Sequence, residues 1–73
     1  MEKMFIAYKG SKLFGLYTDH QKAVESIVTY AFSFSYKMTQ YNKEPGIEFF
    51  MFKSDAGFEE IYELHEIAPN SRV

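Results

Sequence analysis

The segment Met4-Phe-Ile-Ala-Tyr-Lys-Gly-Ser-Lys-Leu-Phe-Gly-Leu-Tyr-Thr18 determines how the chain begins to fold. It contains two short apolar and aromatic runs, residues 4–9 and 13–18, on either side of Gly10-Ser11. Glycine accepts the positive φ that a tight turn requires, so this pattern predicts a β-hairpin. Gly15 lies inside the second run, where a glycine predicts a bulge or the close approach of the helix.

An amphipathic helix is expected directly after the hairpin. Thr18 and Gln21 have the spacing of a capping box, and Asp19 adds negative charge near the positive end of the helix dipole. Apolar residues then recur at steps of three and four, as on a helix that packs against a core. These residues are Val24, Ile27, Val28 and Ala31.

The stretch from residue 30 to residue 38 supports two interpretations. Its even positions are all aromatic or apolar, a period of two that is typical of a strand; they are Tyr30, Phe32, Phe34, Tyr36 and Met38. No Gly, Pro, Asn or Asp stops the preceding helix between Tyr30 and Phe34, and Asn42 is a better stop. We favour a helix that continues to about Met38 and places Phe34 on the core stripe.

Two further strands are expected in the C-terminal half. Turns at residues 43–46 and 54–57 bound the segment 47–53, which is dense in Phe, Ile and Met and predicts a buried strand. Residues 58–67 fit a helix or a strand. The short turn before them favours a strand that pairs with residues 47–53 and directs Tyr62 and Leu64 inward.

The predicted fold is therefore an α+β domain of order ββαββ, in which one helix packs on one face of an antiparallel sheet. We expect a single domain over residues 1–68 and a flexible tail over residues 69–73.

The size, the cysteine content and the length of the apolar runs limit the classes of protein to which this chain can belong. The 73 residues are near the lower size limit at which one hydrophobic core supports a fold unaided, and the absence of cysteine excludes disulfides and thiolate metal sites. No apolar run approaches the roughly 20 residues of a membrane span, and the apolar stretch near residue 1 is too short for a signal peptide. We expect a cytoplasmic protein without membrane contact.

Aromatic residues are more numerous than one small core can bury. Eight Phe and six Tyr make up 19% of the chain, and each buried aromatic removes roughly 150–250 Å² from water. The surplus predicts an exposed patch that binds a partner or a second copy of the chain. The expected partner-binding aromatics are Phe32, Tyr36, Tyr41, Phe50 and Phe52.

Charge is unevenly distributed along the chain. Residues 1–40 carry five lysines against three acidic residues, a balance of +2, whereas residues 41–73 carry three basic against seven acidic residues, a balance of −4. We expect the acidic side chains of the last strand to orient a partner and speed its association. They are Glu59, Glu60, Glu63 and Glu66.

The sequence Phe14-Gly15-Leu16-Tyr17-Thr18, followed by Ala23 in the opening turn of a helix, resembles the second strand and helix start of many very small phage-encoded proteins. The ending Glu59-Glu60-Ile61-Tyr62-Glu63-Leu64-His65-Glu66 resembles their closing strand, which often runs Glu-Glu-apolar-apolar-Glu-Leu. The resemblance implies a ββα-β accessory protein that works in the host cytoplasm. These proteins share no activity, so the resemblance brings no functional residue.

Motifs for catalysis or metal binding are not found. His20 and His65 are far apart, without the spacing of a zinc-binding pair. Ser33 and Ser35 lie between aromatics with no base nearby in the sequence to activate them, and the four glycines form no phosphate-binding loop. We therefore predict no catalytic residue, no metal ligand and no cofactor, and a protein that is not an enzyme.

The function expected from these features is binding and modulation, by inhibition, of a host protein, with self-association through the same aromatics. Two alternatives stay open. One is sequestration of a nucleotide or similar small molecule in a dimer cleft by Lys9, Lys12 and exposed tyrosines. The other is nucleic-acid binding by Tyr8 and Tyr17 beside those lysines. The single arginine argues against nucleic acid, because each phosphate contact typically needs a cation.

Overall fold

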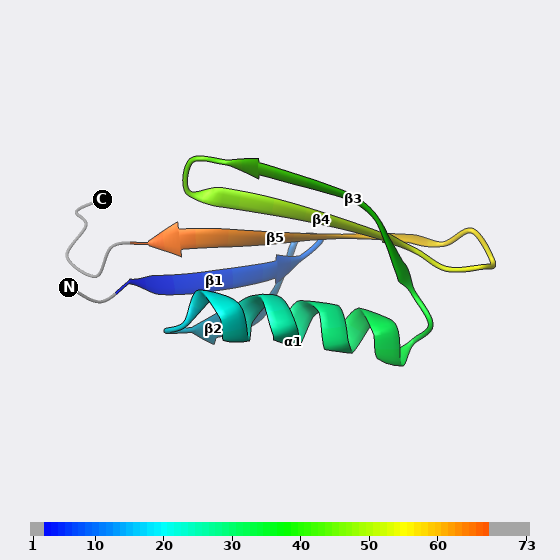
Figure 1. Ribbon diagram of the computed structural model, residues 1–73, viewed down its shortest axis with the longest axis horizontal. Coiled ribbons are helices and arrows are strands. Elements are labelled where there is room, and N and C mark those ends of the chain that lie inside the picture. The colour runs from blue at the N-terminus through cyan, green and yellow to red at the C-terminus, as the bar shows by residue number, and fades with distance from the viewer. Residues whose placement is uncertain (1–2, 68–73) are drawn as a thin grey trace.

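The computed structural model describes residues 3–67 and shows one helix lying along a five-stranded sheet (Figure 1). The elements follow the chain as β1 (Met4–Lys9), β2 (Lys12–Tyr17), α1 (His20–Ser33), β3 (Lys37–Glu44), β4 (Ile47–Lys53) and β5 (Glu59–Ile67). The strands are ordered β2-β1-β5-β4-β3 in the sheet, and all neighbours are antiparallel.

The α+β class and the antiparallel sheet under one helix are confirmed, as is the strand assignment of the last segment. The predicted order ββαββ is wrong, because a further strand, β3, follows the helix and makes the order ββαβββ. The predicted domain boundary at residue 68 and the tail at residues 69–73 lie outside the described residues.

The N-terminal hairpin forms as predicted. Gly10 at its turn has a φ of +62°, in the region that favours glycine. The register between β1 and β2 shifts between Ala7 and Tyr8, so that a bulge lies beside Gly15. A Cβ at Gly15 would lie 2.5 Å from the Tyr17 hydroxyl, so the close approach comes from Tyr17 and not from the helix.

The helix begins one residue later than the capping-box spacing suggests. Asp19 is the N-cap, and its side chain accepts a hydrogen bond from the backbone N–H of Gln21 at 2.9 Å. The Thr18–Gln21 capping box is therefore wrong. The predicted apolar stripe is correct, with Ile27 and Ala31 buried and Val24 and Val28 packed at its margin.

The end of the helix differs from the prediction. Ser35 has a φ of +65°, and its N–H donates to the Phe32 carbonyl while the N–H of Tyr36 donates to that of Ala31, both at 3.0 Å. This is the Schellman arrangement, in which glycine is the usual residue at the left-handed position. The helix therefore stops at Ser33, and Phe34 and Met38 are exposed rather than on the core stripe.

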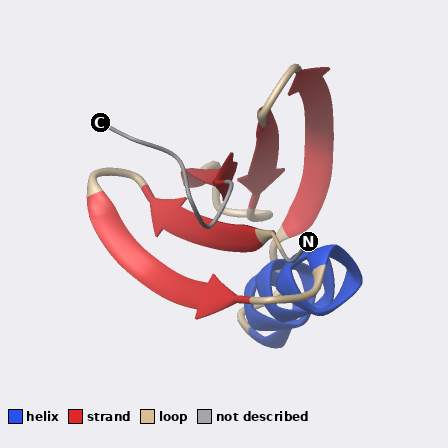
Figure 2. Ribbon diagram, turned by 90° about the vertical axis from the view of Figure 1, so that its left-hand side faces the viewer, coloured by secondary structure: helices blue, strands red, loops and turns tan. Residues whose placement is uncertain are grey.

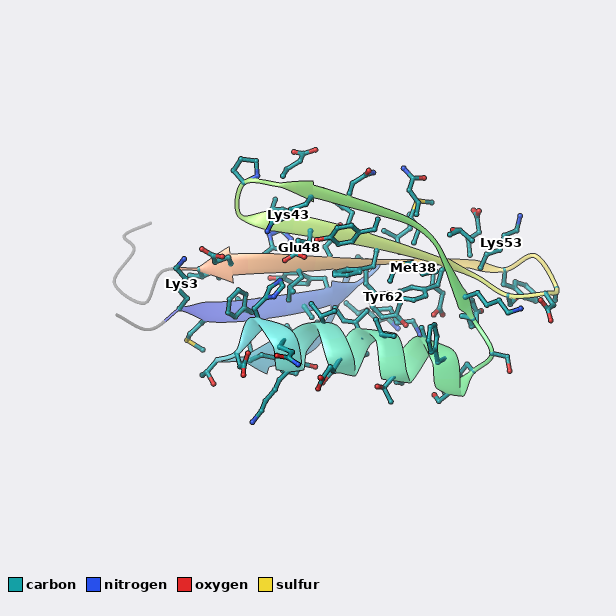
Figure 3. All side chains as sticks on the ribbon, in the orientation of Figure 1. Lys3, Met38, Lys43, Glu48, Lys53 and Tyr62 are labelled. Carbon is teal, nitrogen blue, oxygen red and sulfur yellow. The ribbon has the colours of Figure 1, made fainter. Side chains whose placement is uncertain are left out.

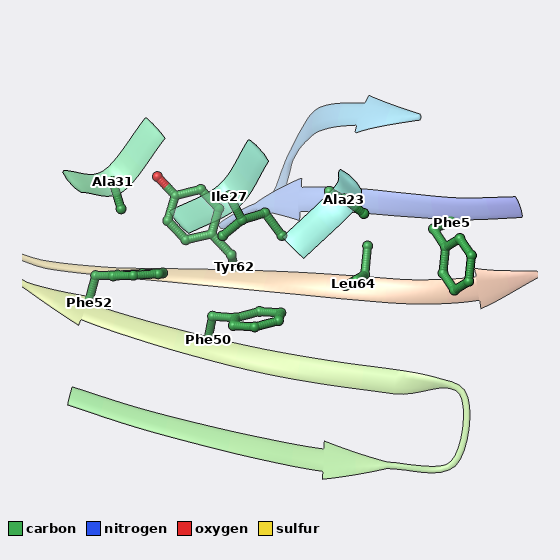
Figure 4. Close-up of a cluster of buried hydrophobic side chains, with 9 residues drawn as sticks. Phe5, Ala23, Ile27, Ala31, Phe50, Phe52, Tyr62 and Leu64 are labelled. Carbon is green, nitrogen blue, oxygen red and sulfur yellow. The ribbon is translucent and has the colours of Figure 1, made fainter. Parts of the chain in front are cut away.

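The core lies between α1 and the facing side of the sheet (Figure 4). The helix supplies two alanines and Ile27, and the sheet supplies most of the large side chains, so the helix backbone can approach the sheet closely at the alanines. Tyr62 is fully buried, and its ring contacts Phe14 and Phe52 edge to face at centroid distances of 5.5 and 5.4 Å. The buried apolar set is Phe5, Ala7, Ala23, Ile27, Ala31, Phe50, Phe52, Tyr62 and Leu64.

The molecule is elongated and its core is one-sided. Its extents are 43 × 19 × 18 Å, and its radius of gyration of 12.7 Å exceeds the roughly 11 Å of a compact chain of this size. Viewed from the end, α1 lies against one side of a strongly twisted sheet, and no second layer formed by residues 3–67 covers the other side (Figure 2). Apolar side chains consequently remain on the surface.

The helix end provides a test of the fold. Replacing Ser35 with Gly should raise the free energy of unfolding by about 1 kcal/mol, because glycine adopts the left-handed conformation without the steric cost that serine bears. Urea denaturation with an unchanged m-value would measure this difference.

Ser33→Gly is the matched control, since Ser33 is the last helical residue and its hydroxyl donates to the Tyr30 carbonyl. It should lower the free energy of unfolding, by about 0.5–1 kcal/mol. If Ser35→Gly destabilised the protein as much as Ser33→Gly, the helix would continue through residue 35 in solution.

Candidate functional site

Glu48 on β4 is the one charged side chain that is buried within residues 3–67, with an exposed fraction of 7%. Figure 3 shows it on the face of the sheet that α1 covers. One of its carboxylate oxygens accepts a hydrogen bond from the Tyr41 hydroxyl at 2.5 Å, and the other is paired with Nε2 of His20. The Glu48 cluster thus joins β4 to β3 and to the first residue of α1.

Strand alternation explains why this carboxylate is buried. Glu48 precedes Phe50 and Phe52 at steps of two, so all three side chains point to the helix side of the sheet. A buried carboxylate is costly unless its oxygens are hydrogen-bonded, and both oxygens of Glu48 have partners. From the sequence, His20 was considered only as a zinc ligand and Glu48 was missed, although the alternation of Glu48 with the two phenylalanines could have indicated its burial.

The geometry of the Glu48 cluster fits a structural role better than that of a catalytic triad. In a triad a histidine lies between the acid and a nucleophile, but here His20 and Tyr41 bind separate oxygens of one carboxylate. The adjoining hollow of about 270 Å³ is lined by both signs of charge, including Lys3, Lys43 and Glu44. Among residues 3–67, no three His, Asp or Glu side chains are grouped so as to hold a metal ion.

The Glu48 cluster makes the Tyr41 hydroxyl less acidic. Its hydrogen bond to Glu48, aided by burial and by the negative charge of the carboxylate, raises the pKa of Tyr41 to about 12. Ionised Tyr41 would repel Glu48, so this interaction stabilises the fold below the ordinary tyrosine pKa and is lost as the pH rises through the folded value.

In a second polar cluster, the side chain of Lys9 is paired with groups of the same chain. Its ammonium group pairs with Glu60 at 3.0 Å and lies 5.1 Å from the centre of the Tyr30 ring, while Glu60 also accepts a hydrogen bond from the buried Tyr62 hydroxyl at 3.0 Å. Hydrogen bonding to Glu60 raises the pKa of Lys9, and burial raises that of Tyr62. Lys9 is therefore engaged within the chain, which weakens the alternatives that assign it to a nucleotide or nucleic acid.

The predicted partner-binding aromatics do not form one surface. Phe50 and Phe52 are buried in the core, because they share the helix-facing side of the sheet with Tyr62, and their assignment to a binding surface is wrong. Tyr36 is partly buried against the core. Phe32 and Tyr41 are exposed, at 56% and 45%, but on different elements.

The predicted acidic set is also divided, because alternate residues of β5 point to opposite faces. Glu60 and Glu66 lie on the helix side, where Glu66 pairs with Lys3 at 3.1 Å as Glu60 does with Lys9. On the other face, Glu63 pairs with His65 at 3.0 Å, and Glu59 lies opposite Lys53 on β4. The four carboxylates therefore make no continuous acidic stripe.

An aromatic surface does occur where α1 ends. Phe32 and Phe34 are 56% and 58% exposed, and an open hollow of about 530 Å³ lies beside Phe32. The Phe34 ring packs edge to face on Tyr30, whose ring packs on Phe14, so that Phe34 is supported from beneath. We call this the helix-end surface; it consists of Phe32, Phe34, Ser35, Tyr36, Lys37 and Asp55.

Comparisons with protein-family models, curated proteins and solved structures found no match to this chain. The residues themselves therefore carry the functional argument. Within the part of the chain that the structure describes, no helix combines the length and the apolar character required to cross a membrane.

The hydrogen bond between Tyr41 and Glu48 is testable by titration of Tyr41. The tyrosinate absorbance of the wild-type protein minus that of Tyr41→Phe isolates Tyr41, and the difference should rise with a midpoint near pH 12. Replacing Glu48 with Gln removes the charge and should shift this midpoint toward the ordinary tyrosine value of about 10.

Circular dichroism recorded at each pH restricts the measurement to conditions in which the chain stays folded. A Tyr41 midpoint near pH 10 in the folded wild-type protein would show that the hydroxyl is not bonded to Glu48 in solution.

Proposed function

We propose that this chain is a non-catalytic accessory protein of the small phage type, which binds a host protein in the host cytoplasm through the helix-end surface and inhibits it. The observation that carries this proposal is the exposure of Phe32 and Phe34, each more than half accessible in the last turn and cap of α1. The resemblance of the hairpin and the closing strand to small phage-encoded proteins supports the proposed phage origin.

Exposed phenylalanines in a fixed position are well suited to binding. Burial of a phenylalanine side chain contributes about 1.5–3 kcal/mol, and aromatic anchors of this kind dominate the energy of many interfaces. The Schellman cap fixes the backbone beneath the two residues, and Tyr30 supports the ring of Phe34. Little conformational entropy is then lost when a partner covers them.

The charges beside the two phenylalanines favour a defined orientation of the partner. Lys37 and Asp55 line the hollow next to Phe32 and present opposite charges across it. Such rim charges act mainly on the association rate and on partner choice.

The proposal predicts which variants lose partner binding. Immobilised wild-type protein should retain a specific host protein from lysate, and Phe32→Ala combined with Phe34→Ala should weaken binding of the purified partner at least tenfold, or about 1.4 kcal/mol. Both residues are exposed, so circular dichroism and the melting temperature should stay close to those of the wild-type protein.

Ile61→Lys is the matched control, because Ile61 is also exposed but lies on the opposite face of the sheet. It should retain the partner. Equal binding by the double phenylalanine variant and the wild-type protein would contradict the proposal, as would a wild-type protein that retains nothing from host lysate.

A further inference from the structure

The face of the sheet opposite α1 is a second surface with different properties. Strand alternation and the observed registers assign its side chains to three central rows. From β3 toward β2, these rows are Gln40, Met51 and Ile61; then Asn42, Phe49, Glu63, Tyr8 and Leu13; then Glu44, Ile47, His65, Ile6 and Leu16. We call this surface the open face.

The open face is mainly apolar and uncovered. Leu13 and Ile61 are 61% and 44% exposed, and Leu16 is similarly accessible, while the aromatic and aliphatic residues between them are partly buried by their neighbours only. No element within residues 3–67 packs over this side, as the end view shows (Figure 2). A contiguous apolar area of this kind is typical of an interaction surface.

The polar groups at the centre of the open face satisfy each other. Nε2 of His65 is 3.0 Å from a carboxylate oxygen of Glu63, and the His65 ring packs edge to face on Tyr8 at a centroid distance of 5.2 Å. Burying an unpaired charge is costly, whereas a charge that already has its partner is far less so. The central pair can therefore be covered without leaving an isolated charge.

Charges at the ends of the open face have opposite signs. Lys37 and Lys53 lie at one end of β3 and β4, with Glu59 of β5 opposite Lys53, and Glu44 lies at the other end of β3. Along β3 itself, the two end charges are therefore opposite in sign. If a second copy is turned about an axis that runs across the strands, Lys37 of one chain lies over Glu44 of the other. The face is thus electrostatically complementary to itself, and a copy in this orientation is attracted.

The open face is large enough for a dimer. Five strands about 4.8 Å apart, each contributing about six residues at roughly 3.3 Å, give an area on the order of 500 Å² on each chain. Two copies would bury about 1,000 Å² in total, which is the lower limit for a specific interface.

We propose that the occupant of the open face is a second copy of this chain, packed sheet against sheet with the strands nearly aligned and both helices outside. Aligned sheets pack about 10 Å apart with interdigitating side chains, as in β-sandwiches. The two exposed phenylalanines of the helix-end surface, Phe32 and Phe34, take no part in this contact, because they lie at the end of α1 on the other side of the sheet. Lys37 lies at the border between the two surfaces. The dimer therefore presents two helix-end surfaces to solvent.

Sedimentation equilibrium from about 1 µM to about 1 mM chain tests this proposal. The wild-type protein should show twice the chain mass of 8.6 kDa at the upper concentrations. Ile61→Lys should be monomeric, because it places a charge in the apolar part of the interface. Phe32→Lys is the matched control on the helix-end surface and should remain dimeric.

A charge exchange tests the orientation. Lys37→Glu should weaken the dimer about fivefold, and Lys37→Glu combined with Glu44→Lys should restore it. These residues lie seven positions apart on one strand, roughly 23 Å, so they cannot compensate within a chain. Restoration would therefore report a contact between copies.

A wild-type protein that is monomeric at about 1 mM would overturn the dimer. Dimers retained by Ile61→Lys and lost in Phe32→Lys would assign self-association to the helix-end surface instead. A double charge variant no tighter than Lys37→Glu would overturn the proposed orientation. Host-protein capture is measured separately, so loss of one proposal leaves the other testable.

Discussion

Ala23, Ile27 and Ala31 bring the backbone of α1 close to the ring-bearing face of the sheet, and the remaining elements are arranged around this contact. The two alanines leave room for Tyr62 and Phe52, which would be held farther away by larger helical residues. Because each buried aromatic contributes a large area, a helix of 14 residues can stabilise a sheet of five strands. The helix cannot cover both faces, and the excess of apolar side chains follows from that limit.

The Glu48 cluster extends the core to β3 and β4, and the Glu60 cluster joins β5 to β1 beneath the helix. Glu48 ties β3 and β4 to the start of α1 through Tyr41 and His20, and Glu60 binds Tyr62 and Lys9 farther along the sheet. Neither carboxylate is left without partners. Buried polar groups whose bonds are all made favour one arrangement of the strands over others. The carboxylates of these two clusters therefore act by holding strands and helix together.

Local sequence signals predicted the hairpin, the helical stripe and the strand nature of β4 and β5, because Gly10, the short turns and the density of apolar residues act over a few residues. The predictions failed where the position of a side chain depends on contacts between residues that are far apart in the sequence. Phe50 and Phe52 belong to the core because they share the helix-facing side of the sheet with Tyr62 of the neighbouring strand, which composition cannot reveal. The pairing of Glu48 with His20 joins residues 28 positions apart and had no local signal beyond strand alternation.

The conformation of Ser35 explains why the predicted helix end was wrong, and it also shapes the proposed binding surface. A residue other than glycine holds a positive φ only where its surroundings impose it, and here the two cap hydrogen bonds and the partly buried Tyr36 do so. By ending the helix at Ser33, this turn leaves Phe34 exposed and frees residues 37–44 to form β3. A helix continued to Met38 would have no β3 edge and no exposed aromatic cap. The left-handed Ser35 thus creates the helix-end surface, because it ends the helix before Phe34 and directs the chain into β3.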